Sequence, residues 1–447
     1  MKRALIIWLV KILYALGSLI GKGTSMPGAI ALKLCPDILK RLQLPKLVVA
    51  VTGSNGKTTT VEMIARAMEK NGMNVAWNKG GSNQIEGVTT MLCRRADRRG
   101  KVRADAVVIE SDERYARYTF SYFTPTHFVI TNLFRDQMTR NGHPEWIAEL
   151  IEKAVSDDTV LVLNADDPLV ARFGKDRPGT IYFGMAENAY STKEPVGCYE
   201  DCPYCPVCQQ PLTYDYYHFA GLGRWHCESC GFETPPADVL VTDLNLDSQT
   251  MEINGSDTMH ISFAGRYFVY NLCAAYAVCT LAGISGAKTA EALSGHVQQS
   301  GRVAEFEAGE RRGVLLTGKH ENSVSYNQGI EYVARAGGEP AEVCVLVNSI
   351  SRKYFTGEIS WLWDVNFEQL NQPHIQKILL CGRYAYDLAT RFSYTGIPAE
   401  KIEILPSVED IGVRFREKGT ARLYVITCFS DQENIYRQVH ALTPVAK

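Results

Sequence analysis

The sequence predicts an α/β protein in which a domain built on a parallel sheet is followed by a smaller α/β domain. Between residues 47 and 185, continuous apolar strand segments alternate with helical segments, a pattern typical of a parallel sheet covered on both faces. A cysteine-rich stretch at 198–236 interrupts this alternation, and a second alternation begins near residue 303. The strand segments of the first block are LVVAVTG, ADAVVIESDE, THFVITN, TVLVLNADD and TIYFG.

These changes of pattern suggest boundaries within the 447 residues, a length that suits two or three domains. We expect an N-terminal helical segment at 1–44, a central domain at 45–302 with an insertion at 198–236, and a C-terminal α/β domain at 303–447. Expected strands of the last domain include VLLTGKH, AEVCVLVNSI, KILLCG, KIEIL and ARLYVITC.

Charge and cysteine content narrow the class of protein. The formal net charge is −2, which gives no basic signature for nucleic-acid binding. Many of the thirteen cysteines stand singly in apolar runs, as buried free thiols do, so a reducing cytoplasm fits better than a disulfide scaffold.

The N-terminus, MKRALIIWLVKILYALGSLI, has a basic start and an apolar stretch. Its uninterrupted apolar run, residues 4–10, ends at Lys11 and is too short for a spanning helix. We favour an amphipathic or largely buried helix over a cleaved signal peptide. The sequence leaves open whether this helix touches the membrane surface or a partner.

The stretch VVAVTGSNGKTTT at 48–60 reads as a strand, a glycine turn and the start of a helix. In such a turn, backbone N–H groups cradle phosphate oxygens, Lys57 reaches the terminal phosphates and the Thr58 hydroxyl can hold Mg²⁺. The usual pattern has a glycine where this chain has Val51, so the loop is shorter. A strand, turn and helix with a chance lysine is the alternative. The expected phosphate-binding residues are Gly53, Asn55, Gly56, Lys57, Thr58 and Thr59.

Polar residues follow several of the predicted strands. Glu110 ends one strand, where a carboxylate ligand for Mg²⁺ would face the phosphate loop, although residues 111–113 could equally form a solvated loop. Two further strands are followed by such residues, which individually are more often turn formers or helix caps. They are Asn132, Asp136, Asn164, Asp166 and Asp167.

Two C-x2-C pairs separated by eighteen residues predict a tetrahedral zinc site. The pairs are Cys205 with Cys208 and Cys227 with Cys230, and four thiolates leave no coordination position for water, so the site would be structural. Cys202 forms a competing C-x2-C pair with Cys205. Other candidate ligands in the stretch are Cys198, His218 and His226.

Taken in order, these motifs resemble the central domain of the Mur ligases and folylpolyglutamate synthetases. The motifs are GSNGKTTT, Glu110, TNLFRDQ, NADDP, Gly265 with Asn271, and Ser300-Gly301-Arg302. The four-cysteine ribbon, the segment GKGTSMPGAIALKLCPDILKRL and the segment SWLWDVNFE are similar more narrowly to the MurT family, the ligase subunits of an enzyme that amidates the peptidoglycan precursor lipid II.

This resemblance implies an ATP-dependent reaction in which the α-carboxylate of D-glutamate is activated as an acyl phosphate and then amidated by ammonia. It implies that Lys57 holds the terminal phosphates, and that Thr58 and Glu110 hold Mg²⁺. Asn132, Asn271 and Arg302 would contact the nucleotide. The expected bound groups are therefore ATP, Mg²⁺ and a structural Zn²⁺ ion.

The resemblance also implies a heterodimer with a GatD-like glutaminase, acting on lipid II in the cytoplasm, with peripheral membrane contact as a further option. Asp364, in Trp361-Leu362-Trp363-Asp364, would complete the catalytic triad of the partner by orienting its histidine. Considered without the resemblance, Asp364 is better explained as a helix cap beside two core tryptophans.

Several positions depart from the family pattern and bear on substrate choice. Phe268 replaces an asparagine expected to contact the nucleotide base, and the loops at 319–322 and 348–353 are unusual. One alternative is a Mur-type ligase that joins an amino acid and needs no glutaminase. Another is an interaction or nucleic-acid-binding protein with a regulatory ATPase, which the near-neutral charge and the single basic residue of the ribbon, Arg224, disfavour.

Overall fold

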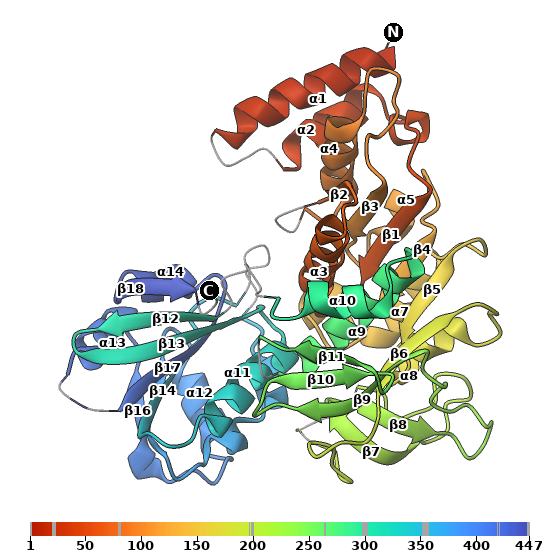
Figure 1. The fold of residues 1–447 in the computed structure, drawn as a ribbon. Helices are drawn as coiled ribbons and strands as arrows, with labels where there is room; N and C mark the ends of the chain where they lie inside the picture. Colours follow the sequence, from red (N-terminus) through yellow and green to blue (C-terminus); the bar gives the residue numbers. More distant parts are fainter. Residues whose placement is uncertain are drawn as a thin grey trace. The chain divides into compact units, whose positions relative to one another are not determined.

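The computed structural model describes residues 2–19, 24–78, 82–195, 197, 201–262, 265–296, 303–350, 357–417, 419 and 421–444. These residues form two compact units. The first unit contains the described residues of 1–134, 143–195 and 201–296, and the second contains those of 135–142, 196–200 and 297–447. Figure 1 shows the elements of both units.

The first unit is built on a nine-stranded sheet with the order β11-β10-β9-β6-β5-β4-β1-β3-β2. Neighbouring strands from β9 to β2 pair in parallel, and β10 and β11 pair antiparallel at one end. The strands are β1 (Leu47–Thr52), β2 (Val75–Trp77), β3 (Ala106–Glu110), β4 (His127–Ile130), β5 (Val160–Asn164), β6 (Ile181–Met185), β9 (Val239–Asn245), β10 (Thr250–Ile253) and β11 (Asp257–His260).

Helices cover both faces of this sheet. Val48 and Ala50 of β1 belong to a core shared with α1, α2, α4, α5 and α7, whereas Val49 and Val51, also buried, point to the other face. The helices of this unit are α1 (Lys2–Ser18), α2 (Met26–Leu34), η1 (Leu39–Arg41), α3 (Lys57–Lys70), α4 (Ile85–Arg95), α5 (Ala116–Phe120), α7 (Pro144–Glu152), α8 (Pro168–Ala171), η2 (Arg172–Gly174), α9 (Arg266–Leu281) and α10 (Gly286–Leu293).

The second unit contains a seven-stranded sheet with the order β16-β15-β14-β17-β13-β12-β18. The strands from β16 to β13 are parallel, and β12 pairs antiparallel with β13 and β18. The strands are β12 (Val303–Ala308), β13 (Arg311–Gly318), β14 (Ala341–Leu346), β15 (Ile375–Cys381), β16 (Ile402–Leu405), β17 (Arg422–Cys428) and β18 (His440–Pro444). Its helices are α6 (Met138–Asn141), α11 (Ser323–Arg335), η3 (Ser360–Asp364), η4 (Phe367–Leu370), α12 (Ala385–Phe392), η5 (Ala399–Lys401), α13 (Val408–Phe415) and α14 (Gln432–Tyr436).

The α/β fold class predicted from the sequence is confirmed. The strand segments expected between 47 and 185 are found as β1, β3, β4, β5 and β6, and those of the second block as β13 to β17. The sequence analysis missed β2 and β12. Strand β2 is an apolar run of only three residues, and β12 alternates buried and exposed side chains with glutamates on its outer face, so neither presents a long apolar run.

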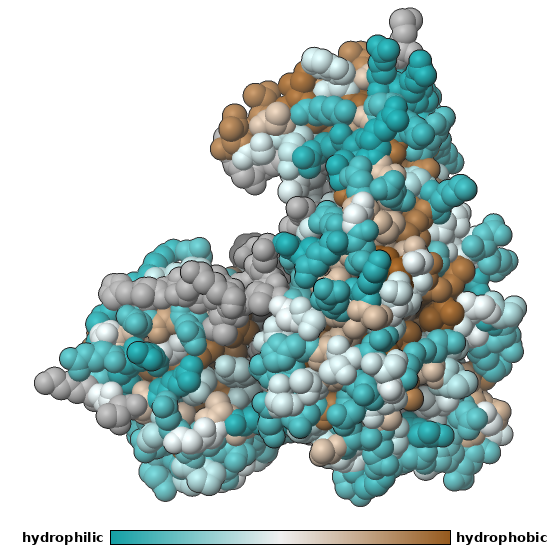
Figure 2. Space-filling view, in the orientation of Figure 1, coloured by the Kyte–Doolittle hydropathy of each residue, from teal (hydrophilic) through white to brown (hydrophobic). Residues whose placement is uncertain are grey.

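The N-terminal segment forms α1, which is half buried. Ile6, Ile7 and Val10 pack into the core of the first unit, whereas Leu5 and Trp8 remain largely exposed. Figure 2 shows hydrophobic residues gathered along the outer side of this helix. Among the described residues, no helix combines the length and the hydropathy that a bilayer-spanning segment requires.

We predict that Ile7→Ala lowers the free energy of unfolding of the first unit by about 2–5 kcal/mol, because Ile7 is 1% exposed and its removal leaves a cavity. The matched change Leu5→Ala, at a side chain that is 70% exposed, should alter it by less than about 0.5 kcal/mol. Urea unfolding of both variants measures the difference. Equal effects would contradict the packing of α1 described above.

Candidate functional site

The loop between β1 and α3 has the backbone conformation of a phosphate-binding turn. Gly53 and Gly56 have φ angles of +131° and +85°, in the region that favours glycine. Neighbouring polar side chains also approach them closely: a Cβ atom on Gly56 would lie 2.1 Å from Oδ1 of Asn271, and one on Gly53 would lie 2.3 Å from Oγ1 of Thr131. Both positions therefore require glycine.

Asn132, which follows β4, holds this loop in place. The backbone N–H of Asn55 donates to Oδ1 of Asn132 at 2.9 Å, and Nδ2 of Asn132 donates to the carbonyl of Asn55 at 3.2 Å. The Ser54 hydroxyl donates to the carbonyl of Phe134 and accepts from its N–H. The structure therefore places Asn132 against the loop backbone.

Lys57 begins α3 and is buried. Its ammonium group forms an ion pair with Glu113 at 3.0 Å and donates to the carbonyls of Gly53 and Ser54. The alternative of a solvated loop at 111–113 is wrong, because all three residues are buried. Glu113 is a site residue that the sequence analysis missed, since a run of polar residues after a strand does not reveal which one turns inward.

Glu110 is positioned beside the loop by strand pairing, because it is the register partner of Val51 in β1. Oε1 of Glu110 accepts from Nδ2 of Asn83 at 3.2 Å, and Asn78 hydrogen-bonds both backbone groups of Glu110. Its other oxygen, Oε2, is buried without a hydrogen-bond partner among the described residues. An unpaired buried carboxylate oxygen is a chemically suitable ligand for a hard cation.

Two side-chain amide groups near the loop also have a buried polar atom that lacks a hydrogen-bond partner among the described residues. These atoms are Nδ2 of Asn55 and Nδ2 of Asn271. Oδ1 of Asn271 accepts instead from the Thr60 hydroxyl of α3 at 3.3 Å. Unpaired buried N–H groups beside a glycine turn fit a ligand that supplies acceptor oxygens, as a nucleotide does. Thr58 is partly exposed at the start of α3.

The polar residues after β5 have structural contacts. The Asp166 carboxylate accepts from the Tyr270 hydroxyl at 2.6 Å and from the N–H of Met185, while Asp167 caps α8 and accepts from the N–H of Leu133. Burial raises the pKa of both carboxyl groups to about 7. Nδ2 of Asn164 donates to the carbonyl of Thr131. These contacts agree with the alternative of turn formers and helix caps.

The remaining candidates lie in the second unit or outside the described residues. Asp136 forms an ion pair with Lys319 at 2.8 Å and accepts from Asn322 at 2.9 Å. Asp364 ends η3, and its Oδ1 lies 3.2 Å from Nη1 of Arg135. Arg302, together with Ser300 and Gly301, lies outside the described residues.

Asp364 has an unusual environment for a carboxylate. Partial burial raises its pKa, and the Arg135 guanidinium opposes that rise. Two aromatic side chains lie on the same unit: Trp363 is 44% exposed and Tyr394 is 71% exposed, and their rings pack edge to face with centroids 5.3 Å apart. Exposed, paired aromatic rings beside a partly buried charge are typical of a surface that binds a protein.

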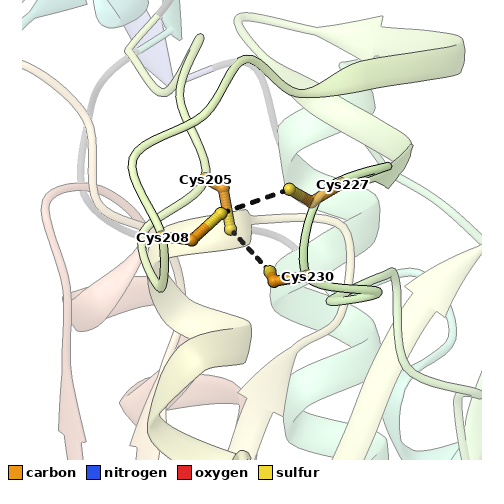
Figure 3. Close-up of side chains that lie close together, drawn as sticks. All are labelled: Cys205, Cys208, Cys227 and Cys230. Carbon is orange, nitrogen blue, oxygen red and sulfur yellow. Dashed lines mark hydrogen bonds between the residues drawn. The ribbon is translucent and has the colours of Figure 1, made fainter.

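The four cysteines of the predicted zinc site come together (Figure 3). The sulfur atoms of Cys205, Cys208, Cys227 and Cys230 all lie within 4.8 Å of one another. The closest pairs are Cys208 with Cys227 at 3.4 Å and Cys205 with Cys230 at 3.6 Å. Four thiol groups at this separation suit a tetrahedral Zn²⁺ ion.

Two similar turns present these sulfur atoms. In each turn, the residue that follows the second cysteine has a left-handed φ angle and donates its N–H to the carbonyl of the first cysteine. This residue is Gln209 in the first turn and Gly231 in the second. Strands β7 (Thr213–Phe219) and β8 (Leu222–His226) join the turns as a hairpin. The buried side chain of Trp225 packs with Phe232 beneath the cluster.

The other candidate ligands of this stretch do not join the cluster. The Cys202 thiol donates to the carbonyl of Tyr204 at 3.2 Å. His218 is buried between Ser191 and the carbonyl of Met185, and burial lowers its pKa to about 4. His226 lies 3.7 Å from Asp215. Cys198 lies outside the described residues.

We predict that Cys230→Ser lowers the zinc content of the purified protein well below the value of about one ion per chain that a four-cysteine site holds. The matched change Cys202→Ser should leave the zinc content unchanged, because Cys202 is outside the cluster. Elemental analysis after removal of free metal measures both. Loss of zinc in the Cys202 variant, or full retention in the Cys230 variant, would contradict this ligand set.

Two family models match the chain. The Mur ligase middle domain matches residues 51–204, which include the phosphate loop, Glu110 and Asn132. The MurT ligase C-terminal family matches residues 320–431, which include Asp364.

Solved structures show the same fold. A pseudomurein peptide ligase type C from Methanothermus fervidus aligns with a TM-score of 0.67 and 21% identity, covering 90% of this chain and 80% of that one. MurF from Acinetobacter baumannii aligns with a TM-score of 0.63 and 16% identity, covering 92% and 80%. MurF from Thermotoga maritima, solved in complex with ADP, aligns with a TM-score of 0.57 and 15% identity, covering 92% and 83%.

Curated relatives align with most of the length of the chain. The MurT subunit of lipid II isoglutaminyl synthase (glutamine-hydrolyzing) from Streptococcus pneumoniae is 31% identical over 427 residues, covering 92% of this chain and 91% of the relative. The corresponding subunit from Staphylococcus aureus strain COL is 29% identical over 373 residues, covering 83% and 82%. With this identity along nearly its full length, the chain belongs to the MurT family of ATP-dependent Mur-type ligase subunits.

Proposed function

We propose that this chain is the ligase subunit of a lipid II isoglutaminyl synthase, which uses ATP and ammonia to amidate the α-carboxylate of D-glutamate in the lipid-linked stem peptide. Family membership supports the proposal. The observation that carries it is the glycine turn with buried Lys57 beside an unpaired oxygen of Glu110. This arrangement suits phosphoryl transfer from a nucleotide.

The residues of the turn fit ATP and Mg²⁺. Backbone N–H groups of the turn would bind phosphate oxygens, and the unpaired amides of Asn55 and Asn271 would supply further donors. Thr58 and Glu110 would hold the Mg²⁺ ion. When bound, the ion would neutralise part of the negative charge of the phosphates. We propose that the Lys57 side chain moves from Glu113 to the terminal phosphates when ATP binds. Lys57 and Glu113 are both buried, and a single ammonium group cannot pair fully with Glu113 and with the phosphates at the same time.

The proposed reaction has two steps. A carboxylate oxygen of D-glutamate attacks the γ-phosphorus of ATP, and the bond from that phosphorus to ADP breaks to give an acyl phosphate. The nitrogen of ammonia then attacks the acyl carbon, the bond from that carbon to the phosphate oxygen breaks, and the leaving phosphate takes up the proton that the nitrogen loses. Lys57 would stabilise the negative charge that develops on the transferred phosphoryl group.

Ammonia would come from a GatD-like glutaminase bound to the second unit. The exposed pair Trp363 and Tyr394 supports a protein-binding surface there, and Asp364 lies in the same segment as Trp363. We propose that Asp364 completes the catalytic triad of the glutaminase by accepting a hydrogen bond from its histidine. Burial raises the pKa of this carboxyl group, and the Arg135 guanidinium 3.2 Å away opposes that rise by favouring the charged form.

The proposed substrate also suggests where the enzyme acts. Lipid II is anchored in the membrane by its lipid, so we propose a cytoplasmic protein that works peripherally at the inner face of the cell membrane. A Mur-type ligase that joins an amino acid would need no glutaminase, and the assays below separate it from the proposed enzyme.

We predict that Lys57→Met lowers the rate of ATP-dependent lipid II amidation by about 10²–10³-fold, because a charge opposed to the developing phosphoryl charge is lost. The control Lys70→Met removes a lysine at the other end of α3, whose Nζ donates to the carbonyl of Ala292, and should retain activity. Mass spectrometry of lipid II measures both rates. Full activity of the Lys57 variant would contradict the proposed phosphate site.

We also predict that Asp364→Asn strongly reduces glutamine-dependent amidation by the complex and leaves ammonium-dependent amidation largely intact. The reason is that an amide cannot support the positive charge of the partner histidine. Asp387→Asn, an exposed acidic residue of α12, should change neither activity. An equal loss of both activities in the Asp364 variant would place Asp364 in the ligase site or in folding instead.

A further inference from the structure

The outer face of α1 carries a continuous apolar stripe. Its four large side chains are Leu5, Trp8, Ile12 and Leu16, of which Leu5 is 70%, Trp8 65% and Leu16 59% exposed, and Leu19, which is 82% exposed, follows the end of the helix at Ser18. At about 100° per residue the four helical positions fall within an arc of about 80° and extend over about 17 Å of helix. Figure 2 shows this hydrophobic surface along α1. A stripe of this size on a folded unit marks an interaction site.

The stripe is separate from the packing that holds α1 in place. Ile6, Ile7, Val10 and Gly17, on the opposite side of the helix, are the residues that are buried. The exposed side chains therefore contribute little to the fold, and keeping large apolar side chains in water costs free energy. A partner surface would remove that cost.

Charge identifies the occupant as an anionic surface. The first 36 residues contain five lysines and arginines and no aspartate or glutamate, in a chain whose net charge is −2. Two copies meeting through this face would bring like charges together, whereas an anionic phospholipid surface would attract them. An apolar stripe containing a tryptophan, with cations on the same helix, is the pattern of an interfacial helix.

A cavity adjoins α1 in the same unit. It has a volume of about 370 Å³, and its lining includes Tyr14 of α1, Glu69 of α3, Arg94 and Arg95 of α4, and Asn78. Asn78 hydrogen-bonds the backbone of Glu110. The cavity is therefore a polar space that lies next to the lipid-facing helix and has one lining residue, Asn78, in contact with the proposed Mg²⁺ ligand.

We propose that the stripe on α1 docks the enzyme on anionic phospholipid and that the adjoining cavity admits the polar part of the lipid-linked substrate. The docking stands on the exposed stripe and the charge alone. The role in admitting substrate rests on the proposed function.

Vesicle binding tests the docking. The full chain is sedimented with vesicles of phosphatidylcholine, with and without phosphatidylglycerol. The wild-type protein should bind the vesicles that contain phosphatidylglycerol, less strongly as salt is raised. Leu5→Ser/Trp8→Ser should weaken that binding by at least about tenfold. The control Leu281→Ser/Val413→Ser, which changes two exposed apolar residues of α9 and α13, should bind as the wild type does.

Three outcomes would overturn the docking proposal. These are wild-type protein that binds neither vesicle, a stripe variant that binds like the wild type, and a wild-type dimer that the stripe variant abolishes. Circular dichroism and thermal unfolding establish that the stripe variant is folded. A folded variant is expected, because neither substituted side chain is buried.

The activity of the complex with its glutaminase tests the role in substrate delivery. The stripe variant should amidate lipid II in detergent micelles at the wild-type rate and lipid II in anionic vesicles several-fold more slowly. Equal rates in both formats would overturn that role. If the wild-type complex binds vesicles but amidates lipid II in neither format, the proposed function fails and the docking stands.

Discussion

The candidate site depends on the contact between the glycine turn at 53–56 and two asparagines from elsewhere in the first unit. Asn132 exchanges hydrogen bonds with the backbone of Asn55, and Asn271 leaves room for no side chain at Gly56. Because these partners come from the segment after β4 and from α9, the turn has its shape only when the sheet and α9 are both in place. The turn is therefore organised before a ligand binds, which reduces the entropy lost on binding.

Two acidic side chains in the same site, Glu113 and Glu110, differ in their contacts. Lys57 and Glu113 form a buried ion pair, whereas one oxygen of Glu110 has no hydrogen-bond partner within the part of the chain that the structure describes. A buried carboxylate oxygen without a hydrogen-bond donor costs free energy. Under the proposed function, a divalent cation would bind the free oxygen of Glu110 and a triphosphate would bind Lys57.

Much of this arrangement could be predicted from the sequence, because it depends on local pattern. Apolar runs predicted β1, β3, β4, β5 and β6, and cysteine spacing predicted which four sulfur atoms meet. The pairs Lys57 with Glu113 and Arg135 with Asp364 could not be predicted, since each joins residues distant in the chain. The outer face of α1 was also unresolved, because an apolar N-terminal run does not indicate which side packs until the helix meets its sheet.

The most direct test of the account is mass spectrometry of lipid II incubated with this chain alone, MgATP and a high concentration of ammonium salt. Ammonium replaces the glutaminase, so the ligase chemistry proposed for this chain is measured by itself. The account predicts conversion of the D-glutamate α-carboxylate to an amide, with release of one phosphate from each ATP consumed. No conversion by folded, zinc-loaded protein, or incorporation of an added amino acid in place of ammonia, would contradict it.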